Sequence, residues 1–285
     1  MKVAILCICT GKYAIFWEEF FISFETYFLP TATKEYFVFS DAEELVGVDT
    51  GRVHIKHMEW QPWPIPTLMK FHTFLSVKDE LVDFDYIYQP NSNARCRRLI
   101  TEEMFLPRKE MGEQLMFTEH PAKWHVKGYK YPYERNPESM AYVPYNRSAV
   151  GVFGAMNGGE AVAYIEFMEQ MTRRTEKDLK QCIIPIHHDE SYVNNYIVRH
   201  MEAGNIRFLP SDYAYPQEYN IPCQRVIELE DKNVYFDTVV MKTIQVSKGK
   251  RTLMQKVLGR MRTYNKKLRV WCRQVSDTIL VREAN

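Results

Sequence analysis

Residues 1–12 read Met-Lys-Val-Ala-Ile-Leu-Cys-Ile-Cys-Thr-Gly-Lys, an apolar run that ends in a turn. Val3–Cys9 shows little alternation between apolar and polar residues and is rich in large and β-branched side chains. This pattern is typical of a parallel strand that is buried on both faces. The run is short for a secretion signal and has no small-residue cleavage site. We therefore predict that it forms the first strand of a buried parallel sheet.

The segments that follow alternate between helix and strand patterns. In chain order, the predictions are a helix over Ile15–Phe28, a strand over Tyr36–Ser40, a helix over Thr67–Glu80, a strand over Tyr86–Tyr88, a helix over Glu160–Lys180, an apolar strand over Ile183–Ile186 and a helix starting near Ser191. The early strand–helix–strand order builds a parallel sheet, and such sheets bind ligands at the carboxyl ends of their strands. The expected fold class is therefore α/β.

Composition excludes several other classes of protein. The chain has 285 residues, of which 46% are hydrophobic and 26% charged, which is typical of globular proteins and not of disordered chains, collagen or coiled coils. No apolar run reaches the roughly 18 to 20 residues of a membrane-spanning helix. The six cysteines are scattered without the spacing of a zinc site, so reduced cytosolic thiols are expected.

Charge divides the chain into an acidic body and a basic tail. Residues 242–285 hold 12 basic and two acidic side chains, against 25 basic and 34 acidic ones in residues 1–241. Apolar residues recur in the tail every three or four positions from Met254 to Trp271, which predicts a basic amphipathic helix. It could dock on its own catalytic domain or lie on an anionic membrane surface. Nucleic acid is not expected as a partner, because the acidic body would repel it.

Three polar or small-residue segments are candidates for a site. Asn91-Ser92-Asn93 follows a predicted strand, and side chains two positions apart point the same way from an extended chain. His187-His188-Asp189-Glu190-Ser191 follows the apolar run 183–186, where Asp189 could serve as a helix N-cap and Glu190 would be stabilised by the helix dipole. Gly154–Gly159 could approach a ligand closely or form a turn. Asn91-Ser92-Asn93 and Gly154–Gly159 taken alone are also explained as turns, whereas a helix N-terminus does not account for all the consecutive polar residues of 187–191.

Taken together and in order, these segments resemble the family 6 retaining glycosyltransferases, the group of the blood-group A and B transferases and the α-1,3-galactosyltransferase. The resemblance extends over about residues 2–233. The matching stretches are Glu25–Pro30, Tyr36–Asp41, Trp63-Pro64 with Thr67–His72, Asp85–Asn93, His120-Pro121, Tyr133–Arg135 with Ser139, Ala141 and Tyr142, Gly154–Gly159, and His188–Ser191 with Asn194 and Tyr196.

The resemblance implies a GT-A fold over residues 1–241, with a mixed central sheet, and the transfer of a hexose with retention. The donor would be UDP-galactose or UDP-N-acetylgalactosamine, and the acceptor the 3-hydroxyl of a β-galactoside oligosaccharide or glycolipid, with fucosylated galactose as the animal members' preference. Animal members bind manganese through Asp-x-Asp, but Asn91-Ser92-Asn93 stands there, as in the metal-independent bacterial branch. We therefore expect a bacterial enzyme without a metal or other cofactor, in the cytoplasm or peripheral on the inner face of the membrane.

The same resemblance assigns roles by position. Donor binding falls on Ile8, Thr10, Tyr13, Lys70, Asn91, Asn93, Phe153, Gly154, Ala155, Asp189 and Lys232, and acceptor binding on His120, His187, His188 and Glu190. Lys70 stands where the family has an arginine, which keeps the charge but loses the bidentate fork. Ala155 favours galactose slightly. Pro132 and Pro216 replace polar acceptor-side residues of the animal enzymes, and His187 replaces a tryptophan.

Glu190 is the expected catalytic residue, either as a nucleophile or as a stabiliser of an oxocarbenium-like transition state. Arg95, Arg97 and Arg98 could help to hold the UDP charge or could form a solvated basic helix end. Two other classes of function stay open from the sequence. One is a non-catalytic module that binds a nucleotide sugar or glycan, and the other is an adaptor that its tail recruits to membranes.

Overall fold

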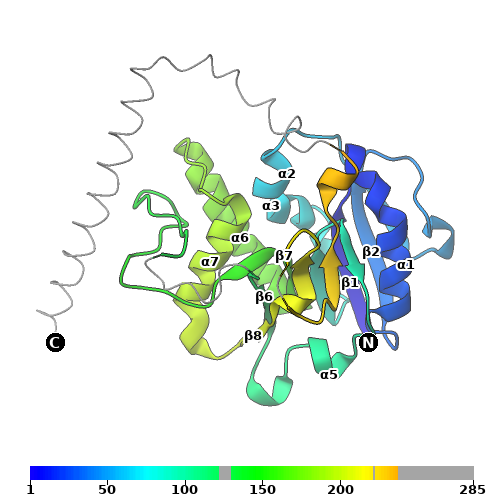
Figure 1. Cartoon of the computed structure of the whole chain (residues 1–285). Coiled ribbons are helices and arrows are strands. Elements are labelled where there is room, and N and C mark those ends of the chain that lie inside the picture. The colour runs from blue at the N-terminus through cyan, green and yellow to red at the C-terminus, as the bar shows by residue number, and fades with distance from the viewer. Residues whose placement is uncertain (122–129, 221, 237–285) are drawn as a thin grey trace, which may run out of the picture.

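The computed structural model describes residues 1–121, 130–220 and 222–236. Its centre is a seven-stranded sheet with the order β3-β2-β1-β4-β7-β6-β8 (Figure 1). The strands are β1 (Lys2–Ile8), β2 (Thr33–Ser40), β3 (Val53–His57), β4 (Tyr86–Pro90), β6 (Leu115–Glu119), β7 (Val152–Glu160) and β8 (Ile206–Leu209). The first four in chain order run parallel, whereas β7 is antiparallel to both β4 and β6. This is the mixed α/β sheet of a GT-A-like fold.

Helices cover both faces of this sheet. In Figure 1, α1 lies on one side of the sheet and α6 and α7 lie on the other. The helices are α1 (Trp17–Tyr27), α2 (Ile65–Leu68), α3 (Lys70–Leu75), α4 (Lys78–Leu81), α5 (Glu102–Phe105), α6 (Ala161–Lys180) and α7 (His188–His200).

Alternate residues of β1 enter two separate hydrophobic cores. Val3, Ile5 and Cys7 pack in the core that contains the phenylalanines of α1, whereas Ala4 and Leu6 pack in the core shared with α3, α6 and α7. All five are fully buried. Because both faces of the strand are covered between Val3 and Cys7, these five positions are apolar, which confirms the prediction from the apolar run.

The structure corrects three of the predicted elements. Thr67–Glu80 is not one helix but is divided among α2, α3 and α4, because Met69 and Val77 leave helical geometry with ψ near 10° and 20°. Ile183–Ile186 is not a strand, and Ile184 and Ile186 are exposed rather than buried. The helix near Ser191 begins three residues earlier, so the polar segment after position 187 is its first turn.

Gly154–Gly159 is not a turn but the middle of β7, between β4 and β6. A methyl group on Gly158 would lie 2.2 Å from the carbonyl oxygen of Ile87 and 2.3 Å from Cδ1 of Tyr88. Real side chains do not approach so closely, so glycine is required here for strand packing. The glycine-rich composition therefore has a structural cause at this position.

A small second sheet lies beside the carboxyl end of β4. It has the order β5-β10-β9, from β5 (Ala94–Cys96), β10 (Ile227–Leu229) and β9 (Tyr215–Pro216). Arg95 therefore lies on a strand and not at a helix end.

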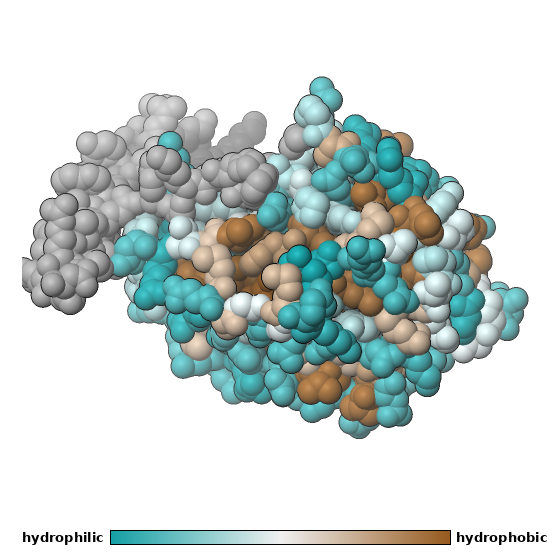
Figure 2. Space-filling view, turned by 90° about the horizontal axis from the view of Figure 1, so that it is seen from below, coloured by the Kyte–Doolittle hydropathy of each residue, from teal (hydrophilic) through white to brown (hydrophobic). Residues whose placement is uncertain are grey.

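The face shown in Figure 2 is mostly hydrophilic, with separate hydrophobic groups rather than one broad apolar patch.

The sequence predicts a basic amphipathic tail and no membrane-spanning helix. The basic tail, residues 242–285, lies outside the described residues, and so does the boundary at residue 241. Among the residues that the structure describes, no helix combines the length and hydropathy needed to span a bilayer.

Candidate active site

A cleft of about 730 Å³ opens at the carboxyl end of β1, where the order of the parallel strands reverses from β2 on one side to β4 on the other. The neighbours of β1 are β2 and β4, and the loops that leave β1 and β4 both line the cleft. Ligands of open α/β sheets bind at such a switch point. The cleft brings together the predicted residues from distant parts of the chain: Ile8, Thr10, Tyr13, Lys70, Asn91, Asn93, Phe153, Gly154, Ala155, His187, His188, Asp189, Glu190 and Lys232.

His120 is the predicted site residue that does not line this cleft. Its side chain is buried, and its ring centroid lies 4.7 Å from that of Phe153, which does line the cleft. His120 follows β6, and its backbone amide donates to the carbonyl of Gly151. The structure therefore places it behind Phe153.

A buried ion pair at the cleft joins α3 to α7. Lys70 Nζ of α3 lies 2.6 Å from Asp189 Oδ2 of α7 and donates to the carbonyl of Gly154 at 3.1 Å. The exposed fractions of the two side chains are 9% and 4%. Asp189 is thus not the N-cap that the sequence suggested. His187 occupies that position, and Asp189 lies inside the first turn, bonded to the lysine.

Glu190 stands next to this pair and is held by the neighbouring strand. The amide of Gly154 donates to Glu190 Oε2 at 3.2 Å. A methyl group on Gly154 would lie 3.3 Å from Asp189 Oδ2 and 3.6 Å from Glu190 Cβ, so the absence of a side chain lets α7 approach β7 closely. The positive end of the α7 dipole stabilises both carboxylates.

Asn194 fixes the distance between α7 and β7. Its Oδ1 accepts from the amide of Val152 at 3.0 Å, and its Nδ2 donates to the carbonyl of the same residue at 3.1 Å. Nδ2 also donates to the carbonyl of Glu190 at 3.0 Å. This amide clamp is the structural reason for Asn194 in the segment that resembles the family.

His188 begins α7 in a left-handed conformation, with φ of 50°. Its ring meets the ring of Trp63 edge-on at a centroid distance of 4.6 Å. Burial lowers the pKa of His188, and the neighbouring Asp189 offsets part of that shift. The imidazole is therefore neutral at pH 7 and can donate or accept one hydrogen bond.

The opposite end of the cleft is aromatic. Tyr13 lies in the 3₁₀ turn Gly11–Phe16 after β1, and burial raises its pKa, so its phenol is un-ionised. Lys232 Nζ, from the 3₁₀ turn Lys232–Val234, lies 5.1 Å from the centre of the Tyr13 ring. A cation is thus held where the loops after β1 and β10 meet.

The segment Asn91-Ser92-Asn93 does not fit a divalent metal ion. Asn93 Nδ2 donates to the carbonyl of Glu230 at 2.7 Å, and its buried Oδ1 has no hydrogen-bond partner. A lone neutral oxygen is a weak ligand for a hard cation. Asp189 is paired with Lys70, and Glu230 with Arg95. Within residues 1–121, 130–220 and 222–236, no three His, Cys, Asp or Glu side chains gather into a metal site.

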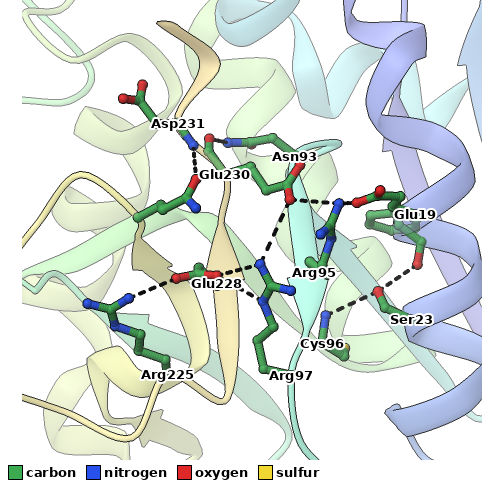
Figure 3. A network of polar contacts seen from close by, with 12 residues as sticks. Glu19, Ser23, Asn93, Arg95, Cys96, Arg97, Arg225, Glu228, Glu230 and Asp231 are labelled. Atoms are coloured by element: carbon green, nitrogen blue, oxygen red, sulfur yellow. Dashed lines mark hydrogen bonds and ion pairs between the residues drawn. The ribbon is translucent and has the colours of Figure 1, made fainter. Parts of the chain in front are cut away.

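Arg95 and Arg97 do not line the cleft but anchor its floor. Figure 3 shows them beside two carboxylates, Glu228 of β10 and Glu230 just after it. Arg95 pairs with Glu230 at 2.7 Å, and Arg97 with Glu228 at 2.6 Å. Glu228 also lies 3.2 Å from Arg225. These ion pairs hold the segment that leads to Lys232, so a direct role of these two arginines at the donor is not supported.

Several residues of the cleft were missed from the sequence. Trp60, Tyr219 and Glu218 line it from loops without a regular pattern. The signal for Trp60 was a tryptophan in a proline-rich loop, which periodicity cannot interpret. Nothing in the sequence distinguishes Tyr219 from the other tyrosines.

Comparison with known proteins identifies the family. The pattern of glycosyltransferase family 6 matches residues 102–232. The chain is 30% identical to the O-antigen biosynthesis glycosyltransferase WbnI of Escherichia coli over 232 residues, which cover 81% of this chain and 95% of that protein.

Two vertebrate relatives match less completely. The histo-blood group ABO system transferase 2 of the rat is 22% identical over 76% of this chain and 64% of its own length. The globoside alpha-1,3-N-acetylgalactosaminyltransferase 1 of the chicken is 23% identical over 75% of this chain and 62% of its own length. The chain thus spans slightly less than two thirds of these two relatives.

Proposed function

The chain belongs to glycosyltransferase family 6, and on this premise we propose that it transfers galactose or N-acetylgalactosamine from UDP to the 3-hydroxyl of a β-galactoside, with retention. As a glycosyltransferase of this family it uses a nucleotide-sugar donor and a glycan acceptor. The observation that carries the finer proposal is the group formed by Glu190, Gly154 and the buried Lys70–Asp189 pair on one wall of the cleft.

Glu190 is the proposed catalytic residue. In the transfer, the bond between the anomeric carbon and the phosphate oxygen breaks, and its electron pair leaves on UDP. On one route a Glu190 oxygen bonds to the anomeric carbon. The acceptor oxygen then displaces it, Glu190 leaves as a carboxylate, and the proton of the acceptor hydroxyl passes to the phosphate of the released UDP. On the other, the acceptor attacks from the side that UDP leaves, its proton passes to the departing phosphate, and Glu190 stabilises the oxocarbenium-like state. Both routes retain the configuration.

Charge on the departing UDP needs preorganised donors. Lys232 and Asn91 line the cleft and are the proposed donors. Asn93 is a poorer donor than the sequence suggested, because one of its amide hydrogens is given to Glu230. Lys70 is proposed to act through Asp189, which it orients towards the donor sugar. We propose that these groups replace a metal ion.

A direct assay tests this proposal. The purified protein is incubated with UDP-galactose and UDP-N-acetylgalactosamine separately, with and without 2′-fucosyllactose, while UDP release and product mass are followed. Transfer that depends on the acceptor is expected, with galactose slightly preferred, because the resemblance puts Ala155 at a position that selects the donor sugar and Ala155 lines the cleft. UDP release without transfer would reject the acceptor, and no turnover with either donor would favour a binding module.

We further propose that the basic tail brings the enzyme to the cytoplasmic face of an anionic membrane. The support is its sequence alone, 12 basic and two acidic side chains between an apolar series of helical spacing. Flotation with vesicles that contain phosphatidylserine should recover the full chain but not a variant that lacks residues 246–285. Equal recovery of both would reject the proposal.

A further inference from the structure

Trp60 is a cleft residue to which the resemblance gives no role. It comes from the loop between β3 and α2, lines the cleft and is 39% exposed. Its indole lies against the backbone of the turn that follows β1, because a methyl group on Gly11 would be 2.7 Å from Trp60 Cδ1. Gly11 has a φ of 56°, and its amide donates to Asp41 Oδ1 at 2.7 Å, which holds the turn in place. A large apolar ring is therefore fixed at the cleft surface.

The two ends of the cleft differ in chemistry. Lys70, Asp189 and Glu190 make one end charged, whereas Tyr13 and Trp60 make the β1 end aromatic. A nucleotide sugar has a matching division, with a hexose at one end, a flat base at the other and the diphosphate between them. The base therefore belongs at the aromatic end.

Tyr13 and Trp60 are not equally available to a base. The Tyr13 ring already has Lys232 over it at 5.1 Å and the edge of Phe236 at 5.2 Å. Among the described residues, no aromatic ring or cation stacks on Trp60. Its accessible surface faces the cleft, and stacking on a base would bury that surface.

We propose that Trp60 stacks on the base of the nucleotide-sugar donor and supplies a large part of the affinity for the nucleotide. The inference rests on the proposed function in that the cleft takes a nucleotide sugar, and it adds the residue that holds the base. Stacking of one base on an aromatic side chain changes affinity by roughly 5- to 150-fold when the ring is removed.

The test measures UDP binding by isothermal titration calorimetry to the wild type, Trp60→Ala, Trp60→Phe and Ile65→Ala. UDP contains no hexose, so a contact between Trp60 and the sugar would not register. We expect Trp60→Ala to weaken UDP binding about tenfold or more, and Trp60→Phe to stay within about threefold of the wild type. Ile65→Ala removes a 41% exposed apolar side chain from the same segment outside the cleft lining and should bind UDP normally.

Inorganic pyrophosphate, which lacks the base, should bind to Trp60→Ala and to the wild type with the same affinity. UDP affinity unchanged in Trp60→Ala would overturn the inference. A parallel loss for UDP and pyrophosphate, or an equal loss in Ile65→Ala, would also overturn it, because it would indicate a distorted loop. A wild type that does not bind UDP would instead reject the proposed function, so the two failures can be distinguished.

Discussion

The parallel part of the sheet and the part beyond β4 contribute differently to the cleft. β1 and β4 are followed by loops that supply Thr10, Tyr13 and Asn91, residues that can contact a nucleotide but carry no formal charge. β7 and α7 supply Gly154 and the two adjacent carboxylates. On the proposed function, the first region would bind the nucleotide and the second would react. The proposed reactive groups lie where the sheet ceases to be parallel, between β4 and β7.

The buried ion pair joins these two regions, so breaking it should have the largest effect. Lys70→Met leaves the Asp189 carboxylate buried without its cation, and we expect a loss of about 3–5 kcal/mol in the free energy of unfolding, measured by urea denaturation. The double variant Lys70→Met/Asp189→Asn should recover part of that loss, since no unpaired charge remains. Losses that simply add would show that the two side chains do not stabilise each other.

Removing the charge of Glu190 should affect catalysis without affecting the fold. Glu190→Gln keeps the acceptor for the amide of Gly154 but loses the carboxylate, so the transfer rate should fall on the order of 10²-fold or more. The matched control is Glu138→Gln, an exposed residue remote from the cleft lining, which should transfer at the normal rate. Near-normal transfer by Glu190→Gln with an unchanged melting temperature would refute the catalytic assignment.

The same two regions differ in how well the sequence predicts them. β1 and α1 follow from an apolar run and from helical spacing, because burial on fixed faces leaves a periodic record in the chain. β7 was missed since its glycines, required for close packing against Ile87, resemble a turn. Ile183–Ile186 was misread as a strand, because hydropathy does not distinguish an exposed apolar loop from a buried strand.

The residues of the site also differ in how well the sequence predicts them. Residues of continuous motifs, such as Asn91 and Glu190, could be identified by position, and the cleft brings them together. The pairing of Lys70 with Asp189 joins residues 119 positions apart, which no local pattern records. The partners of Arg95 and Arg97, Glu230 and Glu228, are also far away in sequence. These ion pairs indicate that the two arginines support the cleft and do not contact the donor.

A smaller effect should appear in the dependence of stability on pH. The pKa of His188 is lower in the folded state than in the unfolded chain, so below about pH 6.5 the unfolded state binds a proton that the folded state does not. Stability is full above the unfolded pKa and falls as the pH drops towards the folded pKa, by at most about 1.4 kcal/mol per pH unit. His188→Asn should flatten this part of the curve, measured by urea denaturation between pH 5 and pH 7.5. An unchanged slope would show that other groups cause it.

The smallest expected effect is that of manganese on the transfer rate. It tests the residues that follow β4, where the parallel part of the sheet ends. Asn91 and Asn93 carry no charge, and the carboxylates Asp189 and Glu230 are engaged by Lys70 and Arg95. We therefore expect equal transfer rates in EDTA and in millimolar manganese.

The double variant Asn91→Asp/Asn93→Asp supplies two carboxylates and tests directly whether the asparagines cause this independence of manganese. If residues 91 and 93 determine whether transfer requires manganese, this variant should lose activity in EDTA and regain part of it with manganese. A wild type that requires manganese would mean that Asn93 Oδ1, buried and without a partner, is a metal ligand after all, and the leaving charge would then be held by the binding region and not by Lys232.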